Sequence, residues 1–186
     1  MAFTHWYSMV VISLLAMLIM DNIQPIMSQP EQTQALIDKI CRSNEDFGFC
    51  IKTFNDNLKD PATDIAGLTR IAIDQCLSNS SNTLGFIGQL LSNTTDEPTK
   101  NALVACQNAY QVVLKSYQDA SVEFDSKDYE DMRKSESVTP RAQASCETSF
   151  STPPNPVDLL VERNRQMRIL ITMAVATGIE LGSPSP

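Results

Sequence analysis

A stripe of apolar and small side chains runs through residues 98–125. Its members recur at alternating intervals of three and four positions, which is the spacing of one face of a helix packed lengthwise on other helices. Glu97 and Pro98 stand at its start, and an acidic residue with a proline is typical of the first turn of a helix. The stripe consists of Leu103, Cys106, Tyr110, Val113, Tyr117, Ala120 and Phe124. This pattern predicts a long helix with one buried face.

Two other stripes predict two more long helices. One follows Pro156 and ends at Gly182, and the other begins after Asp64, whose side chain is suited to cap a helix. Residues 78–83, in the middle of the latter, are polar, so we expect a weak or kinked turn there. The first stripe consists of Leu160, Asn164, Met167, Ile171, Ala174, Gly178 and Leu181. The second consists of Ile65, Leu68, Ala72, Cys76, Thr83, Ile87 and Leu91.

A fourth candidate helix, residues 128–150, has a sparse apolar face. Pro140 lies inside it and has no amide hydrogen to donate, so we expect a kink or a break at that point. The apolar face consists of Tyr129, Met132, Val138, Ala142 and Cys146.

The N-terminal part of the helical region predicts two shorter helices, residues 33–41 and 44–55, that form a hairpin. Its expected inward residues are Leu36, Ile37, Ile40, Phe47, Ile51 and Phe54. Residues 151–156 are rich in proline and predict a loop, and no alternating run long enough to indicate a strand occurs in the sequence. The predicted fold class is therefore all-α, an antiparallel four-helix bundle preceded by an N-terminal helical hairpin, within one domain.

The extreme N-terminus carries a separate apolar run. Residues 9–20 are apolar except for Ser13, and this run is too short for a transmembrane helix, which needs about 20 residues. It has the length of the core of a signal peptide, although no Lys or Arg precedes it. We expect a signal peptide over residues 1–28, cut near Ser28–Gln29, and a helical domain over residues 29–186. The alternative is a buried N-terminal helix.

Composition narrows the possible functions. The chain has 14 Lys and Arg against 22 Asp and Glu, a formal net charge of -8, so neither nucleic acid nor a membrane surface is an expected partner of the mature protein. Removal of the signal peptide takes away His5 and Trp6, the single histidine and the single tryptophan. Catalysis that depends on histidine and imidazole metal sites are then excluded. We expect no catalytic, cofactor-binding or metal-binding residues.

Five cysteines remain in the expected mature chain. Secretion would place them in an oxidising compartment, where pairing is expected. Cys41 and Cys50 flank the turn of the predicted hairpin and are the easiest to join, whereas a Cys106–Cys146 bond would tie two long helices together. Cys76 lies in the middle of a predicted helix. A zinc site is disfavoured, because the chain has no C-x-x-C pair and its histidine is lost.

Two N-x-S/T sequons lie in the region of the second stripe. Asn79 begins N-S-S and Asn93 begins N-T-T. In a secreted chain both are candidate sites of N-glycosylation.

An ordered set of short motifs resembles the plant invertase/pectin methylesterase inhibitor family, over essentially the whole mature chain. No single motif is specific, and the order together with the helical spacing carries the resemblance. The motifs are Cys41 with Phe49-Cys50, Asp60-Pro61, Asp64-Ile65-Ala66-Gly67-Leu68, Ala102-Leu103 with Cys106 and Tyr110, Ser126-Lys127-Asp128-Tyr129, Cys146-Glu147 with Phe150, and Arg163-Asn164. The sequence is most similar to the pollen-type invertase inhibitor branch of the family.

This resemblance implies a fold, a disulfide pattern and a function. The implied fold is a four-helix bundle with an N-terminal hairpin, and the implied disulfides are Cys41–Cys50 and Cys106–Cys146. Cys76 is then left over, and we expect it to be a buried free thiol, with an intermolecular bridge as the alternative. The implied function is inhibition of an extracellular carbohydrate-active enzyme. We expect a cell-wall or vacuolar invertase as the target, with pectin methylesterase as the alternative.

Two departures from the family pattern bear on these expectations. Pro140 and the polar run of residues 133–137 stand where the family has a more apolar helix, so we expect reduced helicity there. Members directed at invertase resemble one another in a Pro-Lys-Phe motif, whereas this chain has Glu97-Pro98-Thr99-Lys100 and lacks the phenylalanine. The residues that we expect to contact the target are Glu97, Pro98, Lys100, Asp128 and Asp131.

Functions of other classes are less well supported. A secreted carrier of an apolar ligand would have to line its cavity with Tyr110, Tyr117 and Met167, but residues at such spacing usually form a core. A glycosidase could use a carboxylate pair such as Asp128 and Asp131, but a small bundle offers no cleft for the reaction. We therefore expect a secreted, apoplastic, monomeric protein that inhibits an enzyme and is not itself an enzyme.

Overall fold

The computed structural model describes residues 28–182, and the expected signal peptide lies almost entirely outside this range. Seven helices and no strand occur in the described part of the chain. Their bounds are α2 Gln29–Cys41, α3 Phe47–Asn57, α4 Ile65–Asn93, α5 Glu97–Asp125, α6 Tyr129–Ser137, α7 Thr139–Ser151 and α8 Val161–Leu181.

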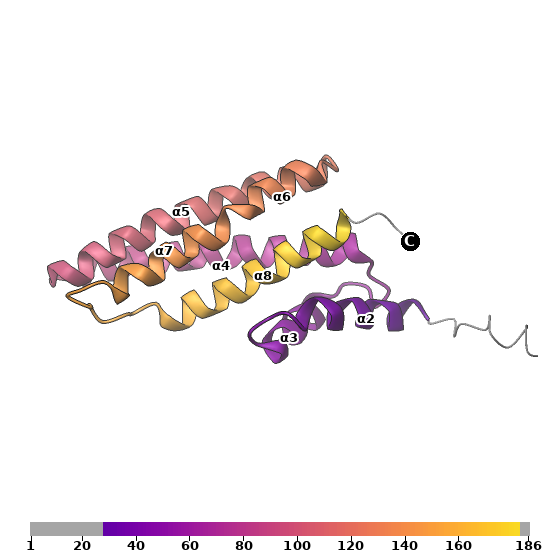
Figure 1. Ribbon diagram of the computed structural model, residues 1–186, viewed down its shortest axis with the longest axis horizontal. Helices are drawn as coiled ribbons and strands as arrows, with labels where there is room; N and C mark the ends of the chain where they lie inside the picture. Colours follow the sequence, from indigo (N-terminus) through magenta and orange to yellow (C-terminus); the bar gives the residue numbers. More distant parts are fainter. Residues whose placement is uncertain (1–27, 183–186) are drawn as a thin grey trace, which may run out of the picture.

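Four long rods form the bundle (Figure 1). Helices α4, α5 and α8 provide three of the rods, and α6 followed by α7 provides the fourth. The hairpin of α2 and α3 lies beside α8 and α4. The predicted all-α bundle with an N-terminal hairpin is confirmed.

Aspartate side chains fix the starts of four helices. In each case the carboxylate accepts a hydrogen bond from a backbone N–H in the first turn, which satisfies a donor that has no partner inside the helix. The donor and acceptor pairs are Phe49 and Asp46 at α3 (2.8 Å), Gly67 and Asp64 at α4 (2.9 Å), Thr99 and Asp96 at α5 (2.9 Å), and Asp131 and Asp128 at α6 (3.2 Å). These caps are readable in the sequence, because each Asp directly precedes its helix.

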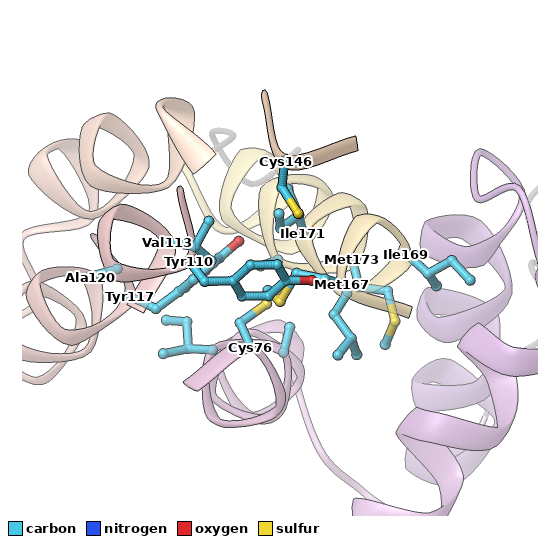
Figure 2. Close-up of a cluster of buried hydrophobic side chains, with 14 of the residues drawn as sticks. Cys76, Tyr110, Val113, Tyr117, Ala120, Cys146, Met167, Ile169, Ile171 and Met173 are labelled. Carbon is cyan, nitrogen blue, oxygen red and sulfur yellow. The ribbon is translucent and has the colours of Figure 1, made fainter. Parts of the chain in front are cut away.

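The predicted stripes of the three continuous long helices form the core. From Leu103 to Ala120 the stripe of α5 is buried, and Cys76 of α4 and Met167 of α8 meet it in the interior (Figure 2). Two expected inward residues face solvent instead. Phe47 is 48% exposed because α3 begins at this residue, after its Asp46 cap, and buries Cys50 and Phe54.

Val138, the second exception, lies where the fourth rod breaks and is 49% exposed, because it is off the buried face that Glu136 and Thr139 share. Pro140 occupies the first turn of α7, where its missing N–H is not needed. The break leaves the helical phase unchanged, because the buried face of α7 continues the spacing of three and four positions that Met132 and Glu136 set on α6. That face consists of Thr139, Gln143, Cys146 and Phe150. The predicted break is therefore confirmed, while residues 133–137 are helical despite their polarity.

The polar middle of α4 does not interrupt the helix, contrary to expectation. Helix α4 is continuous from Ile65 to Asn93. The Ser80 side chain is fully buried, and its hydroxyl donates to the backbone oxygens of Cys76 (2.7 Å) and Leu77 (3.1 Å). Because a small hydroxyl can satisfy itself on the preceding turn, a polar segment can remain helical inside a bundle.

Basic side chains of α8 hold the hairpin against the bundle. Arg165 pairs with Asp46 (3.0 Å), and Arg168 pairs with Glu45 (2.8 Å) in the turn between α2 and α3 and with Glu147 on α7. The Asn44 amide in the same turn donates to the backbone oxygen of Ile169 (3.2 Å). The hairpin is thus attached to α8 by polar contacts as well as by its buried apolar residues.

Candidate functional site

Two disulfides cross-link the helices. Cys41 is bonded to Cys50 across the hairpin, and Cys106 is bonded to Cys146 between α5 and α7. Beside the second disulfide, the Ser149 hydroxyl donates to the backbone oxygen of Ala102 (3.2 Å). The helix pair next to the α5 start is therefore covalently fixed.

Cys76 is a free thiol that is fully buried in the core. Burial raises the pKa of the Cys76 thiol well above its ordinary value, because a thiolate would lose its hydration in this apolar interior. The thiol therefore behaves as a small hydrophobic group and is chemically inert in the folded state.

The α4–α5 turn and the α7–α8 loop lie together at one end of the bundle (Figure 1). We call this end the proline end and define it as residues 93–100 and 152–161. Three of the predicted contact residues, Glu97, Pro98 and Lys100, lie here in the first turn of α5. The Lys100 side chain is 48% exposed and pairs loosely with Glu97, with 3.9 Å between Nζ and Oε1. Lys100 thus presents a positive charge to solvent at this end.

The proline end also has a groove of mixed character, in which Glu97, Asn101, Ser149 and Thr152 lie among prolines. The open groove runs between the start of α5 and the α7–α8 loop, and its wall is lined by Pro98, Pro153, Pro154 and Pro156. Next to it the α7–α8 segment exposes Val157 (71%), Leu159 (43%) and Val161 (62%). Prolines restrict the backbone, so this apolar surface is comparatively rigid. The three exposed residues were not among the predicted contacts, although their positions off the buried stripe of α8 could have identified them.

The opposite end, which we call the acidic end, comprises residues 119–131 around the α5–α6 turn. Most of its carboxylates are engaged within the chain. Asp119 pairs with Lys115, Asp125 pairs with Arg70 of α4, and Glu130 and Asp131 both pair with Lys134 (2.9 and 2.7 Å). Asp128, a predicted contact residue, is the cap of α6. The acidic run therefore has structural roles in addition to its exposure.

The predicted contact residues do not form one patch. Lys100 and Asp128 lie at opposite ends of α5, which has 29 residues and is about 43 Å long at 1.5 Å per residue. A single compact contact surface can include either the Glu97–Lys100 turn or the Asp128–Asp131 turn, but not both. The structure thus divides the sequence-based contact set into two alternatives.

A buried carboxyl group lies near the acidic end. Glu136 of α6 is only 1% exposed, and neither of its carboxyl oxygens has a hydrogen-bond partner among residues 28–182. The pKa of Glu136 is raised to about 8, chiefly by burial, while Arg133 opposes the shift and the nearby Glu123 carboxylate adds to it. Sequence reasoning missed this residue, although Glu136 lies four positions after buried Met132 on the same helix face.

Other predictions concern residues in the interior or the absence of a site. Tyr110, Tyr117 and Met167 are fully buried side by side in the core, and the Tyr110 hydroxyl donates to the Asn164 amide oxygen (3.0 Å), which weighs against a ligand carrier (Figure 2). Within residues 28–182 no cluster of three or more His, Cys, Asp or Glu is suited to hold a metal ion. Over the same range no helix has the length and apolarity required to cross a bilayer.

Comparisons with known proteins agree on one family. The family model described as plant invertase/pectin methylesterase inhibitor matches residues 35–176. A pectinesterase inhibitor of Actinidia deliciosa is 26% identical over 157 residues, which cover 83% of this chain and 84% of that protein. A protein of Platanus acerifolia, named provisionally as an invertase inhibitor, is 26% identical over 140 residues, which cover 75% of this chain and 78% of that protein.

The fold has solved counterparts. The crystal structure of a mutant form of a pectin methylesterase inhibitor from Arabidopsis superposes with a TM-score of 0.69 at 18% sequence identity. The superposition covers 77% of this chain and 95% of that chain. At this level of identity the likeness concerns the fold.

Proposed function

This chain belongs to the plant invertase/pectin methylesterase inhibitor family, and on that premise we propose that it is a secreted inhibitor of a cell-wall or vacuolar invertase. Members of this family are protein inhibitors and not enzymes. Inhibition requires a rigid surface that fits the target, and a pre-organised surface loses little entropy on docking. The cross-linked bundle is suited to this task.

One observation carries the choice of target, namely the exposed Lys100 at the proline end. The Lys100 ammonium group makes a loose 3.9 Å contact with Glu97, beside a groove lined by prolines and the exposed Val157 and Leu159. A projecting cation beside an apolar surface is suited to enter a pocket that carries acidic residues. The name of the Platanus acerifolia relative favours the same target.

Pectin methylesterase is the second candidate. The Actinidia deliciosa relative is named as an inhibitor of pectinesterase, and it matches slightly more of this chain than the Platanus protein does. The missing phenylalanine after Lys100 also weakens the invertase reading. In this second mode an exposed helix face near Asp131 would contact the enzyme.

The same premise supports an extracellular location and an enzyme as partner. Two disulfides are typical of proteins from oxidising compartments, which agrees with secretion into the apoplast. We propose that the inhibitor acts as a monomer, in which one end of the bundle contacts the enzyme.

Charge reversal at the two ends distinguishes the targets. The variants are Lys100→Glu at the proline end and Asp131→Lys at the acidic end, with Asp128→Asn added because asparagine preserves the cap of α6. Lys52→Glu is the matched control, since Lys52 is exposed on α3, outside both ends, and pairs with Asp56 of the same helix. Inhibition constants are measured in parallel against a cell-wall invertase and a pectin methylesterase.

The results distinguish invertase from pectin methylesterase as the target. If only Lys100→Glu weakens inhibition of invertase, the invertase proposal stands, and inhibition should also weaken with rising salt if the enzyme is basic. If only Asp131→Lys matters and the esterase is the enzyme inhibited, the second candidate replaces it. If the wild-type protein inhibits neither enzyme at micromolar concentration, inhibition of these targets is wrong for this chain.

A further inference from the structure

The two glycosylation sequons of α4 differ in their accessibility. Asn93 is the last residue of α4 and is exposed, and Thr94 leaves the helix in an extended conformation with φ -91° and ψ 123°. The Asn93 amide nitrogen, to which a glycan would be attached, donates to the backbone oxygen of Gln89 (2.9 Å) at the surface. Thr95, the sequon hydroxyl, is exposed as well. This sequon lies in a surface turn, where glycans are readily accommodated.

Asn79 lies in a different environment. It is in the interior of α4 and half-buried, and its enclosed amide oxygen has no hydrogen-bond partner in the part of the chain that the structure describes. The next residue of its sequon, Ser80, is fully buried and bonded to the preceding turn. A bulky glycan on Asn79 would start at the edge of the packed bundle rather than in open solvent. The structure therefore favours modification at Asn93 over Asn79.

We propose that Asn93 is N-glycosylated, that Asn79 is not, and that the glycan on Asn93 shields the α4–α5 turn and so limits inhibition. The shielding part rests on the proposed function, because it assumes that Lys100 contacts the target. Three residues separate Asn93 from Glu97, so their Cα atoms are at most about 14 Å apart. Lys100 is one helical turn further along. A large hydrophilic glycan at Asn93 occupies the solvent directly in front of this turn.

The chain offers a matched pair of variants. Thr95→Ala and Ser81→Ala each remove the hydroxyl of one sequon and retain its asparagine, and both hydroxyl residues are exposed. The full chain and both variants are secreted from a eukaryotic host, and glycopeptides are mapped by mass spectrometry before and after peptide N-glycosidase. We expect a glycan at Asn93 that Thr95→Ala abolishes and Ser81→Ala leaves unchanged.

Inhibition assays on the same preparations test the shielding. Thr95→Ala and enzymatically deglycosylated wild-type protein should each inhibit invertase severalfold more strongly than the glycosylated protein, while Ser81→Ala should match the wild type. Deglycosylation of the folded wild-type protein provides this readout even if a variant fails to fold.

Three kinds of result would contradict different parts of this proposal. A glycan at Asn79, or no glycan at Asn93, overturns the assignment of the site. Occupancy at Asn93 with equal inhibition by glycosylated and glycan-free protein overturns the shielding. If no form inhibits either enzyme, the proposed function and the shielding that rests on it both fail, while the glycopeptide map still decides which sequon is modified.

Discussion

The two ends of the bundle are stabilised by different kinds of interaction. Near the proline end, the Cys106–Cys146 disulfide joins α5 to α7, and the loop that follows is restricted by prolines. Near the acidic end, α6 is held by the Asp128 cap, by ion pairs at the surface and by the packing of Met132 and Glu136. The disulfide and the prolines do not depend on pH, whereas the packing of α6 includes the buried carboxyl group of Glu136, which titrates.

This difference bears on function, because the two alternative contact surfaces lie at these two ends. At the proline end the disulfide and the prolines do not titrate, and hydrogen bonds from Thr99 hold the pKa of the Asp96 cap below its usual range, so this cap persists at neutral and mildly acidic pH. The acidic end packs best when Glu136 is protonated, since an ionised carboxylate without a partner is costly to bury. A contact at the proline end should therefore be less sensitive to pH than one at the acidic end. The following four predictions test the contrast, from the largest expected effect to the smallest.

Removal of the second disulfide should have the largest effect. Because Cys106 and Cys146 are 40 positions apart, Cys106→Ser with Cys146→Ser should lower the free energy of unfolding by about 4 kcal/mol. Chemical denaturation under non-reducing conditions measures the loss, which should be similar at pH 5 and pH 7. Cys76→Ala is the comparison, and this buried truncation should cost about 1–2 kcal/mol. Equal losses for the two changes would show that the disulfide adds little.

Glu136 should make stability decrease as pH rises. Its pKa is raised from 4.5 to about 8 in the folded state, so the folded protein retains a proton that the unfolded chain releases above pH 4.5. The stabilisation is fully present below pH 4.5 and is lost as pH rises toward 8, by about 1.4 kcal/mol per pH unit at most. Thermal unfolding of Glu136→Gln should lack this slope and should show higher stability than wild type near pH 7.

Glu130→Gln is the control for this prediction, because Glu130 lies on the same helix with an exposed side chain. It should retain the wild-type slope. If the stability of Glu136→Gln and that of the wild type changed in parallel from pH 5 to pH 8, Glu136 would not be the cause of the pH dependence. The charged neighbours Glu123 and Arg133 contribute to the same equilibrium, so the midpoint should shift when either is neutralised.

A side chain at Gly178 should displace the buried ends of the Glu136 and Met132 side chains. A Cβ atom at this position of α8 would lie 2.6 Å from the Glu136 Oε2 atom and 3.2 Å from the Met132 Cε atom, so α6 approaches α8 closely because Gly178 has no side chain. Gly178→Ala should destabilise the protein by about 1–3 kcal/mol. Gly88→Ala is the control, since no atom lies within 4 Å of its added Cβ, and it should be neutral or stabilising. Equal melting temperatures for the two variants would contradict the close approach.

The smallest expected effects concern one backbone position at each end. Lys127 in the α5–α6 turn has φ 62°, and Asn155 in the α7–α8 loop has φ 54°. Asparagine adopts this left-handed conformation more readily than lysine does. Lys127→Asn should therefore stabilise the protein and Asn155→Lys should destabilise it, each by about 0.5–1 kcal/mol. Changes of the same sign in denaturation midpoints would show that side-chain contacts outweigh the backbone preference.

The sequence by itself determined the helices and most of the core. Helical periodicity and caps are local properties, so the stripe of α5, the Asp64 cap and the break near Pro140 could be read without a structure. The cysteine pairs required the family resemblance in addition, because spacing alone left alternatives open. The polar middle of α4 was misjudged, since the hydroxyl of Ser80 satisfies itself within its own helix.

Tertiary structure decided what depends on the packing of distant segments. Val138 was expected inside and is exposed, because the buried stripe of the fourth rod runs through the polar residues Glu136 and Thr139 instead, which hydrophobic periodicity cannot identify. Glu136 looks like one more charge in a polar run until Gly178 of α8, distant in sequence, allows α6 close enough to enclose it. The separation of Lys100 from Asp128 follows from the straight, unbroken course of α5 between them. A sequence specifies each helix through neighbouring residues. The burial of a carboxyl group, and the set of residues that share one surface, depend on how separate helices pack.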